Sequence, residues 1–469
     1  MSSTRSGSSS SKSHVLIFPF PAQGHILPIL DFTHQLAFAG LNSTILVTPK
    51  NLSNLNSLLS THPSIQTFVL PFPSHPKIPP GVENVSQVGN TINLPMRIAL
   101  SKLQDPIIKW FKSHPSPPVA IISDFMLGWT FKMAHHLGIP RIAFFSSSAF
   151  YASIIKYWSE SAKVLQYLPI LEFSDLPGPP SFKKDHLPTT IRRYRESDPQ
   201  SEFLKDDASA NFLGWGCVFN SFLAVEGLYL DYLRRKLGHS RVYGVGPLAL
   251  MGTNNGMDRG NPNSECNTNY VLKWLDECPD GSVLYVCFGS QKFLEKVQME
   301  ALANGLELSG TRFVWVVKTG TSTTQQKEIV PNGFVDRVIG RGLVINEWAP
   351  QVSILNHPAV AGFLSHCGWN SLLEGITGGA MTLAWPMEVD QFVNARLLED
   401  LGIALRVCEG AEAVPDSAEL AKIIANSICA GSPQKVRAKA LRDEGIEAVA
   451  NNGSSKKDLD EFVKLLPQF

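Results

Sequence analysis

The chain is 469 residues long, more than one compact core usually accommodates, so two domains are expected. Hydrophobic residues make up 44% of the sequence, which argues against a disordered or fibrous protein. Lys plus Arg and Asp plus Glu balance at 41 each, which argues against a dedicated nucleic-acid or membrane-surface binder, because such proteins carry an excess of basic residues.

The N-terminal segment and the cysteines both favour a cytoplasmic location. Residues 1–13 form a Ser-rich tail that is predicted to be disordered. The apolar run behind it, VLIFPFPAQGHILPIL, contains three prolines and a glycine, so it fits neither a signal peptide nor a membrane span. The seven cysteines never occur as C-x-x-C, which favours reduced thiols over disulfides or a zinc site. A monomer is the default expectation.

The region 14–250 is predicted to be an N-terminal domain in which short apolar strands alternate with helices. A strand over 14–20 is followed by a helix over about 25–39, and further strand-like runs occur at 43–48, 119–124, 141–146 and 216–221. Uniformly apolar strands separated by helices predict a parallel sheet covered on both faces. The segments 71–90 and 174–202, rich in proline and polar residues, are predicted loops.

The pattern breaks at 251–270, a segment rich in Asn and Gly that is predicted to be an exposed linker. It then restarts in a second predicted domain, 271–450, with strands at 282–289, 312–318, 342–346, 359–364 and 381–385. Helices are expected near 293–308 and from about 369 and 390. The remaining residues, 451–469, are predicted to form a helix that could pack back on the N-terminal domain. The predicted fold class is α/β, with two doubly wound Rossmann-like domains that face each other across a cleft.

The stretch SHCGWNSLLE, residues 365–374, places many polar groups after a buried strand and at the start of a helix. Gly368 allows a tight turn, and the amides of Trp369, Asn370 and Ser371 would be unpaired donors at the helix start, as an anion site requires. His366 can add a donor, and Glu374 is placed to accept hydrogen bonds from a diol. The alternative is an ordinary helix cap on a strand-to-helix turn.

The longer stretch WAPQVSILNHPAVAGFLSHCGWNSLLEGITGGAMTLAWPMEVDQ, residues 348–391, closely resembles the signature of plant family 1 UDP-dependent glycosyltransferases. Weaker matches, PFPAQGH, ISDF, VYGVGPL and LYVCFGS, extend the resemblance over most of the chain. It implies the GT-B fold, a UDP-sugar co-substrate, no cofactor or metal, and a small-molecule acceptor. The segments WPMEVDQF and LRVCEGAEAVPD, residues 385–392 and 405–416, are most similar to those of members that glycosylate flavonoids and other phenols. Terpenoid or hormone acceptors are the alternative.

The resemblance also implies a role for each matched residue. Trp348 would stack on the uracil beside Ala349, and Gln351 would hold the base and ribose. Glu374 would bind the ribose hydroxyls. The diphosphate would be held by His366, Asn370, Ser371 and Ser290, and the sugar by Asp390 and Gln391. Together with Trp369, the last pair matches the glucose-using pattern and implies UDP-glucose as donor, with UDP-xylose or UDP-rhamnose as alternatives.

The N-terminal domain is expected to supply a catalytic base. His25 follows the first strand, and Asp124 closes the strand VAIISD at the same edge of the sheet. A carboxylate on one imidazole nitrogen fixes the tautomer and stabilises the imidazolium that forms. The two residues match the family's catalytic pair, which implies direct attack of a hydroxyl on the anomeric carbon with inversion. A purely structural histidine is the alternative. The acceptor is expected near Phe20, Gly24, Phe125 and Phe145.

Other classes of protein fit the sequence less well. A nicotinamide oxidoreductase is disfavoured because no G-x-G-x-x-G occurs. A metal site is not expected, because the only D-x-D, Asp458 and Asp460, lies in a predicted helix, where residues two apart point in different directions. A non-catalytic small-molecule-binding GT-B protein is disfavoured because His25 and Asp124 are both present.

Overall fold

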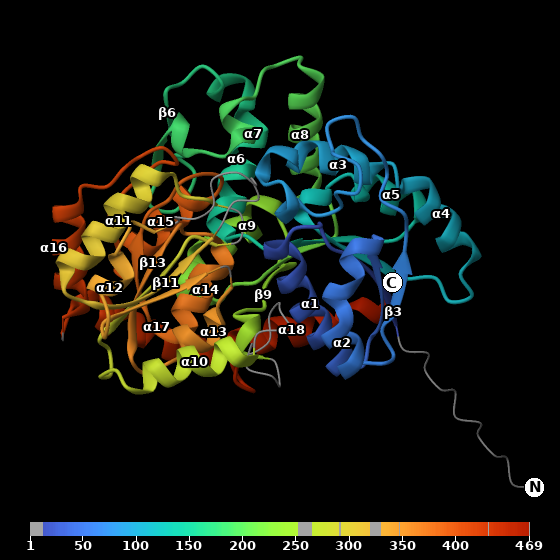
Figure 1. The fold of residues 1–469 in the computed structure, drawn as a ribbon. Helices are drawn as coiled ribbons and strands as arrows, with labels where there is room; N and C mark the ends of the chain where they lie inside the picture. The colour runs from blue at the N-terminus through green and yellow to red at the C-terminus, as the bar shows by residue number, and fades with distance from the viewer. Residues whose placement is uncertain are drawn as a thin grey trace, which may run out of the picture.

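The structure is a computed structural model that describes residues 13–251, 265–289, 292–318, 330–346, 348–429 and 431–468. It contains two large sheets, one in each half of the chain, with helices packed around both (Figure 1). All strand pairs within the two large sheets are parallel, as the sequence predicts. The predicted tail, residues 1–13, lies almost wholly outside the described residues, and so does most of the predicted linker, 251–270.

The first sheet has seven strands in the order β3-β2-β1-β4-β5-β8-β9. Its strands are β1 (His14–Phe18), β2 (Asn42–Val47), β3 (Gln66–Val69), β4 (Ala120–Asp124), β5 (Arg141–Phe145), β8 (Gly216–Phe219) and β9 (Val242–Gly244). The helices of this half are α1 (Gln23–Phe38), α2 (Asn56–Thr61), α3 (Asn93–Ser101), α4 (Gln104–Ser113), α5 (Thr130–Leu137), α6 (Ala149–Leu165), α7 (Thr189–Arg192), α8 (Pro199–Ala210) and α9 (Leu223–Leu237).

The second sheet has six strands in the order β12-β11-β10-β13-β14-β15. Its strands are β10 (Val283–Cys287), β11 (Arg312–Val317), β12 (Gly342–Asn346), β13 (Val360–Ser365), β14 (Met381–Ala384) and β15 (Ala404–Arg406). The helices of this half are α10 (Glu265–Asp276), α11 (Lys296–Ser309), α12 (Phe334–Arg337), α13 (Gln351–Leu355), α14 (Trp369–Gly378), α15 (Gln391–Asp400), α16 (Ser417–Ile428) and α17 (Pro433–Val449).

The central strands of both sheets, such as β1 and β10, are buried on their two faces, which explains why these strands are largely apolar, whereas the edge strand β3 is mostly exposed. In β1, Val15 and Ile17 pack into one hydrophobic cluster, while Leu16 and Phe18 pack into another on the opposite face. In β10, Leu284 and Val286 likewise face a different cluster from Val283 and Tyr285. Side chains alternate across a strand, so a strand without polar residues needs cover on each face.

The last helix, α18 (Ser454–Leu465), packs on the first half of the molecule, as Figure 1 shows. Its Asp458 carboxylate accepts a hydrogen bond from the Gly244 amide at 2.8 Å, and Ser455 donates to the Gly246 carbonyl at 2.6 Å. The Phe462 ring lies 5.6 Å from that of Phe32. Asp458 therefore serves as an anchor for this helix.

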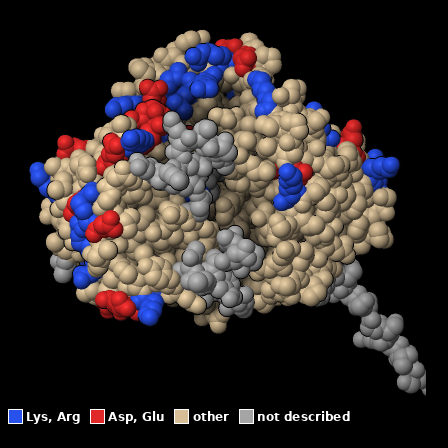
Figure 2. All heavy atoms as spheres, in the orientation of Figure 1, with Lys and Arg blue, Asp and Glu red and all other residues tan. Residues whose placement is uncertain are grey.

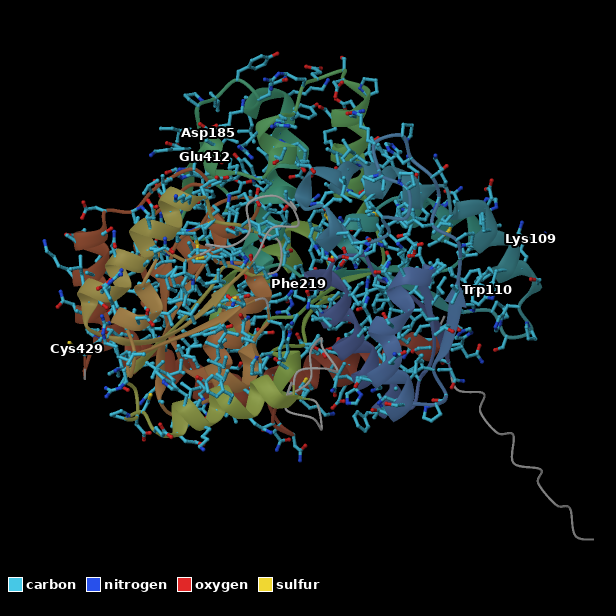
Figure 3. The ribbon with its side chains drawn as sticks, in the orientation of Figure 1. Lys109, Trp110, Asp185, Phe219, Glu412 and Cys429 are labelled. Atoms are coloured by element: carbon cyan, nitrogen blue, oxygen red, sulfur yellow. The ribbon has the colours of Figure 1, made fainter. Side chains whose placement is uncertain are left out.

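The prediction that residues 174–202 form only loop is wrong. The strands β6 (Ile170–Glu172) and β7 (Ser181–Lys183) form an antiparallel pair, and α7 and the start of α8 also fall in or near this segment. The segment reaches the second half, where the His186 ring stacks on Phe392 at 4.3 Å. Figure 3 labels Asp185 of the first half and Glu412 of the second half in the region where this segment meets the second half. Short polar elements of this kind lack the periodicity that would reveal them in the sequence.

Candidate active site

In each large sheet, the point at which the strand order reverses lies beside the same hollow of the molecule. In the first sheet, β1 and β4 are neighbours whose chain connections run to opposite sides, and in the second sheet β10 and β13 are related in the same way. Ligands of doubly wound folds bind beyond the carboxyl ends of such strands. Figure 2 shows this face hollowed where the halves meet, and one pocket is lined by residues from both halves.

His25 and Asp124 come together after β1 and β4. The Nδ1 atom of His25 lies 2.9 Å from the Asp124 carboxylate, whose other oxygen accepts from the Met126 amide at 2.8 Å. The Ser146 hydroxyl, at the end of β5, lies 3.0 Å from the same Nδ1. Asp124 is fully buried, whereas the His25 side chain is 23% exposed. A carboxylate on Nδ1 places the proton there and leaves Nε2 as an acceptor.

Aromatic rings surround the His25 imidazole. Phe125 stacks on it with 5.4 Å between ring centroids, and Phe20 meets it edge-on at 5.3 Å. Phe145 stacks beneath Phe125 and on Phe219, the residue labelled near the middle of Figure 3. Phe20 and Phe145 are each 1% exposed, so they support the site from the core, and only the half-buried Phe125 could line an acceptor pocket.

The pocket between the halves contains six of the residues predicted to bind the nucleotide. They are Trp348, Ala349, Gln351, Asn370, Ser371 and Glu374. Gly24, expected beside the acceptor, lines this pocket instead, and its carbonyl accepts a hydrogen bond from Asn370 Nδ2 at 2.5 Å. This contact joins the first turn of α1, which carries His25, to the start of α14.

Gln351 forms hydrogen bonds with three other side chains that line the pocket. Its Nε2 donates to the Glu374 carboxylate at 2.7 Å and to the Ser371 hydroxyl at 3.3 Å, while its Oε1 accepts from the Tyr285 hydroxyl at 3.2 Å. The carboxylate of Glu374 is therefore held in one orientation at the pocket wall. A fixed carboxylate is a suitable acceptor for two neighbouring hydroxyls, such as those of a ribose.

The start of α14 can bind an anion. The helix begins after Gly368 without a side-chain cap, so the amides of its first turn have no acceptor within the helix. Together with the helix dipole, these amides favour a negative group at this end. The Ser371 hydroxyl lies in the same turn, and Lys318, at the end of β11, lines the same pocket. Ser290, the remaining predicted diphosphate ligand, lies outside the described residues.

His366 lies between two glycines at the base of this turn. A Cβ atom on Gly289 or on Gly368 would lie 2.6 Å from the imidazole, and Gly289 also has a φ of +75°. Loss of solvation, together with the charge of Lys318, lowers the pKa of His366 to about 4. The ring is therefore neutral at pH 7 and can donate one hydrogen bond to a phosphate.

Comparison with known proteins supports the same interpretation of both halves. The glycosyltransferase N-terminal domain model matches residues 11–250, and the UDP-glucoronosyl and UDP-glucosyl transferase model matches residues 269–427. UDP-glycosyltransferase 89A2 of Arabidopsis thaliana is 51% identical over 456 residues, which cover 96% of this chain and 95% of the relative. The chain belongs to the UDP-glycosyltransferase family.

Further relatives support the activity and the fold. Flavonol 3-O-glucosyltransferase UGT89B1 of Arabidopsis thaliana is 46% identical, over 97% of this chain and 96% of the relative. The crystal structure of Arabidopsis thaliana UGT89C1 complexed with UDP-L-rhamnose has a TM-score of 0.81 and 37% identity, and covers 97% of this chain and 100% of its own. The predicted family and two-domain GT-B fold are confirmed, and the protein is a UDP-sugar-dependent glycosyltransferase.

Two predicted donor contacts differ in this glycosyltransferase from what the sequence suggests. The Trp369 indole is buried and donates to the Asn220 carbonyl at 3.0 Å, so only its backbone amide can face the diphosphate. The Gln391 carboxamide oxygen accepts from the amides of Met387 and Glu388 at 2.9 and 3.0 Å. Because its oxygen is engaged in this way, Gln391 can offer a sugar only the NH2 group of its carboxamide.

Several residues of the glycosyltransferase site are missed in the sequence. Lys318 directly follows β11 and Ser146 directly follows β5, at the same sheet edges as His366 and Asp124, and that position is a signal that could have identified them. Tyr285 lies inside a buried strand and resembles any core aromatic residue.

Within the part of the chain that the structure describes, no group of three or more His, Cys, Asp or Glu is placed to hold a metal ion, and no helix is long and apolar enough to cross a membrane. Metal independence stays a prediction. Figure 2 shows basic and acidic side chains interspersed on the visible face, in keeping with the balanced composition.

Proposed function

We propose that this glycosyltransferase transfers glucose from UDP-glucose to a hydroxyl of a flavonoid or another small phenol and inverts the anomeric carbon. The proposal is supported by the relative named flavonol 3-O-glucosyltransferase and by a structural neighbour at 37% identity that was crystallised with quercetin. UDP-glucose acts as a co-substrate, and no cofactor takes part. The cytoplasmic location and the monomeric state expected from the sequence stay predictions.

The observation that carries the mechanism is the contact between His25 Nδ1 and the buried Asp124 carboxylate. His25 Nε2 accepts the proton of the acceptor hydroxyl while the hydroxyl oxygen forms a bond to the anomeric carbon. The bond from that carbon to the β-phosphate oxygen breaks, and UDP leaves with the electron pair. Asp124 stabilises the imidazolium and returns it to the same tautomer after the proton is lost to solvent.

The departing UDP carries negative charge that the second half of the molecule must stabilise. The first-turn amides of α14 and the Ser371 hydroxyl supply donors without a metal ion. The neutral His366 adds one further donor. Trp348 holds the uracil and Glu374 the ribose, both at a distance from the bond that breaks.

The sugar contacts are assigned to Asp390 and Gln391. Loss of solvation raises the pKa of the Asp390 carboxyl, and its hydrogen bond from Asn394 and the nearby His25 oppose that rise. A second candidate donor is UDP-rhamnose, because one relative at 38% identity is named flavonol 7-O-rhamnosyltransferase.

The test is a transfer assay with purified protein, a panel of flavonols, simple phenols, terpenoid alcohols and plant hormones, and four UDP-sugars. We expect the highest kcat/KM with UDP-glucose and a phenolic acceptor, and a β-glucoside product by NMR. A higher kcat/KM with UDP-rhamnose or UDP-xylose would overturn the donor assignment, and a retained anomer would overturn the mechanism. UDP binding with no transfer to any acceptor would instead indicate a non-catalytic binding protein.

A further inference from the structure

Asn394, one turn into α15, uses both ends of its carboxamide to connect three parts of the site. Its Nδ2 donates to the Asp390 carboxylate at 2.9 Å and to the Cys367 carbonyl at 3.1 Å. Its Oδ1 accepts from the Ser148 hydroxyl of the first half at 2.8 Å. The side chain is fully buried, so these bonds are protected from water.

The partner in the first half is itself rigidly held. Ser148 caps α6, where its hydroxyl accepts from the Tyr151 amide at 3.2 Å. The buried Glu226 carboxylate accepts from the next two amides of that helix, Ala149 and Phe150, at 2.9 and 2.8 Å. The Ser148 hydroxyl therefore offers Asn394 a fixed point of attachment.

The same short segment also contacts the catalytic pair. Ser146 lies two residues before Ser148, and its hydroxyl is 3.0 Å from His25 Nδ1. The segment 146–148 thus contacts His25 at one end and, through Asn394, Asp390 at the other. The base and the sugar-binding carboxylate are therefore connected by hydrogen bonds at the two ends of this segment and by the three residues of backbone between them.

The loops that Asn394 joins have unusual backbone conformations. Cys367 and Val389 are non-glycine residues with φ values of 68° and 60°. Such conformations cost free energy and persist where surrounding contacts hold them. Asn394 contacts Cys367 directly, and it contacts Asp390, the residue that follows Val389. One side chain therefore holds the ends of two strained turns.

We propose that Asn394 is a positioning residue that sets the Asp390 carboxylate against the donor sugar and fixes its place relative to His25 through Ser148. The proposal rests on the proposed function, in which Asp390 accepts hydrogen bonds from sugar hydroxyls. It predicts that the bond between Ser148 and Asn394, although distant from the uracil, affects which sugar is transferred.

The experiment compares Asn394→Ala, Ser148→Ala and the double variant with wild type. The readouts are kcat/KM for UDP-glucose and UDP-galactose and the Kd of UDP by calorimetry. We expect kcat/KM for UDP-glucose to fall about tenfold in each single variant, as the loss of a hydrogen bond to a charged or buried group implies. The preference for UDP-glucose over UDP-galactose should narrow severalfold, while the Kd of UDP stays close to that of wild type.

The double variant should lose little more than Asn394→Ala alone, because both changes remove the same connection. Asp198→Ala is the matched control: Asp198 caps α8 in the same half of the molecule but makes no bond to any described residue of the second half, so the sugar preference of this variant should be that of wild type. If Asn394→Ala does not fold, Ser148→Ala with this control decides the question.

An unchanged sugar preference in Ser148→Ala, or losses that add fully in the double variant, would overturn the positioning role. Failure of the proposed function has a different signature, since the wild-type protein itself would then transfer no glucose from UDP-glucose while still binding UDP.

Discussion

The first turn of α1, after β1, and the first turn of α14, after β13, meet at one pocket, yet they present polar groups in different ways. The first brings a side chain, His25, to a carboxylate about one hundred residues further along the chain. The second relies on backbone amides at the start of α14 and on residues within one contiguous stretch. Proton transfer requires one titratable group with a controlled tautomer, whereas diphosphate binding requires many fixed donors. The first half therefore depends on single side chains more than the second does.

The largest expected effect is that of His25→Ala. An acceptor hydroxyl is a poor nucleophile until a base takes its proton, and positioned general bases contribute about 10²–10⁴-fold, so kcat should fall by that factor. The Kd of UDP, measured by calorimetry, should not change, because the His25 side chain does not line the nucleotide pocket. The matched control is His136→Ala, an exposed histidine on α5, which should retain full activity.

A smaller loss is expected for Asp124→Asn. An amide can still contact His25, but it cannot stabilise the imidazolium by charge, and one oxygen cannot replace both carboxylate oxygens, which bond His25 and Met126. We expect kcat to fall about 10- to 100-fold, the range for a hydrogen bond to a charged group. A kcat lower than that of His25→Ala would show that the carboxylate has a role beyond orienting this imidazole.

His366 in the second half should make the free energy of unfolding depend on pH. Its folded-state pKa of about 4 lies below the ordinary value of 6.5, so the unfolded chain binds the proton first as pH falls. The stability that the neutral ring confers is complete above pH 6.5 and is lost as pH falls toward 4. Because the ring is half-buried, we expect a loss of about 2 kcal/mol, less than the full shift would give.

Urea unfolding at pH 7 and pH 4.5 measures this effect. The difference in free energy of unfolding between the two pH values should be smaller in His366→Gln than in wild type, while His136→Gln should match wild type. An equal pH dependence in wild type and His366→Gln would contradict a neutral ring at this position.

The smallest effect on turnover is expected for Glu374→Ala. The ribose contact is the same in the ground state and the transition state, so its loss should raise the KM for UDP-glucose about tenfold and leave kcat nearly unchanged. Glu300→Ala, an exposed glutamate on α11, is the control. A collapse of kcat with an unchanged KM would show that Glu374 acts on the reacting bond and not on the ribose.

Much of the fold and of the nucleotide pocket could be predicted because the signals are local. Apolar strands that alternate with helices reveal the sheets, and the single stretch 348–391 carries all six of the predicted nucleotide-binding residues that line the pocket. His25 and Asp124 could also be paired, because parallel strands that end at one sheet edge bring their loops together.

The remaining features depend on contacts between distant segments. The Trp369 indole donates a hydrogen bond to the Asn220 carbonyl, 149 positions away in the chain. Only the packing of the folded protein shows that Phe125 is half-buried at the site whereas Phe20 and Phe145 lie in the core. Asn394 resembles an ordinary helix residue until its contact with Ser148, 246 positions away in the chain, is known.

The most direct test of the central claim, that the first half supplies a base while the second half holds the donor, is a series of phenols of graded acidity. The ratio of kcat/KM in wild type to that in His25→Ala is measured for each phenol at saturating UDP-glucose. The ratio should rise steadily as the phenol becomes less acidic, because acidic phenols need less help in losing the proton. A ratio that is the same for every phenol, or wild-type rates of His25→Ala with the least acidic one, would contradict the account.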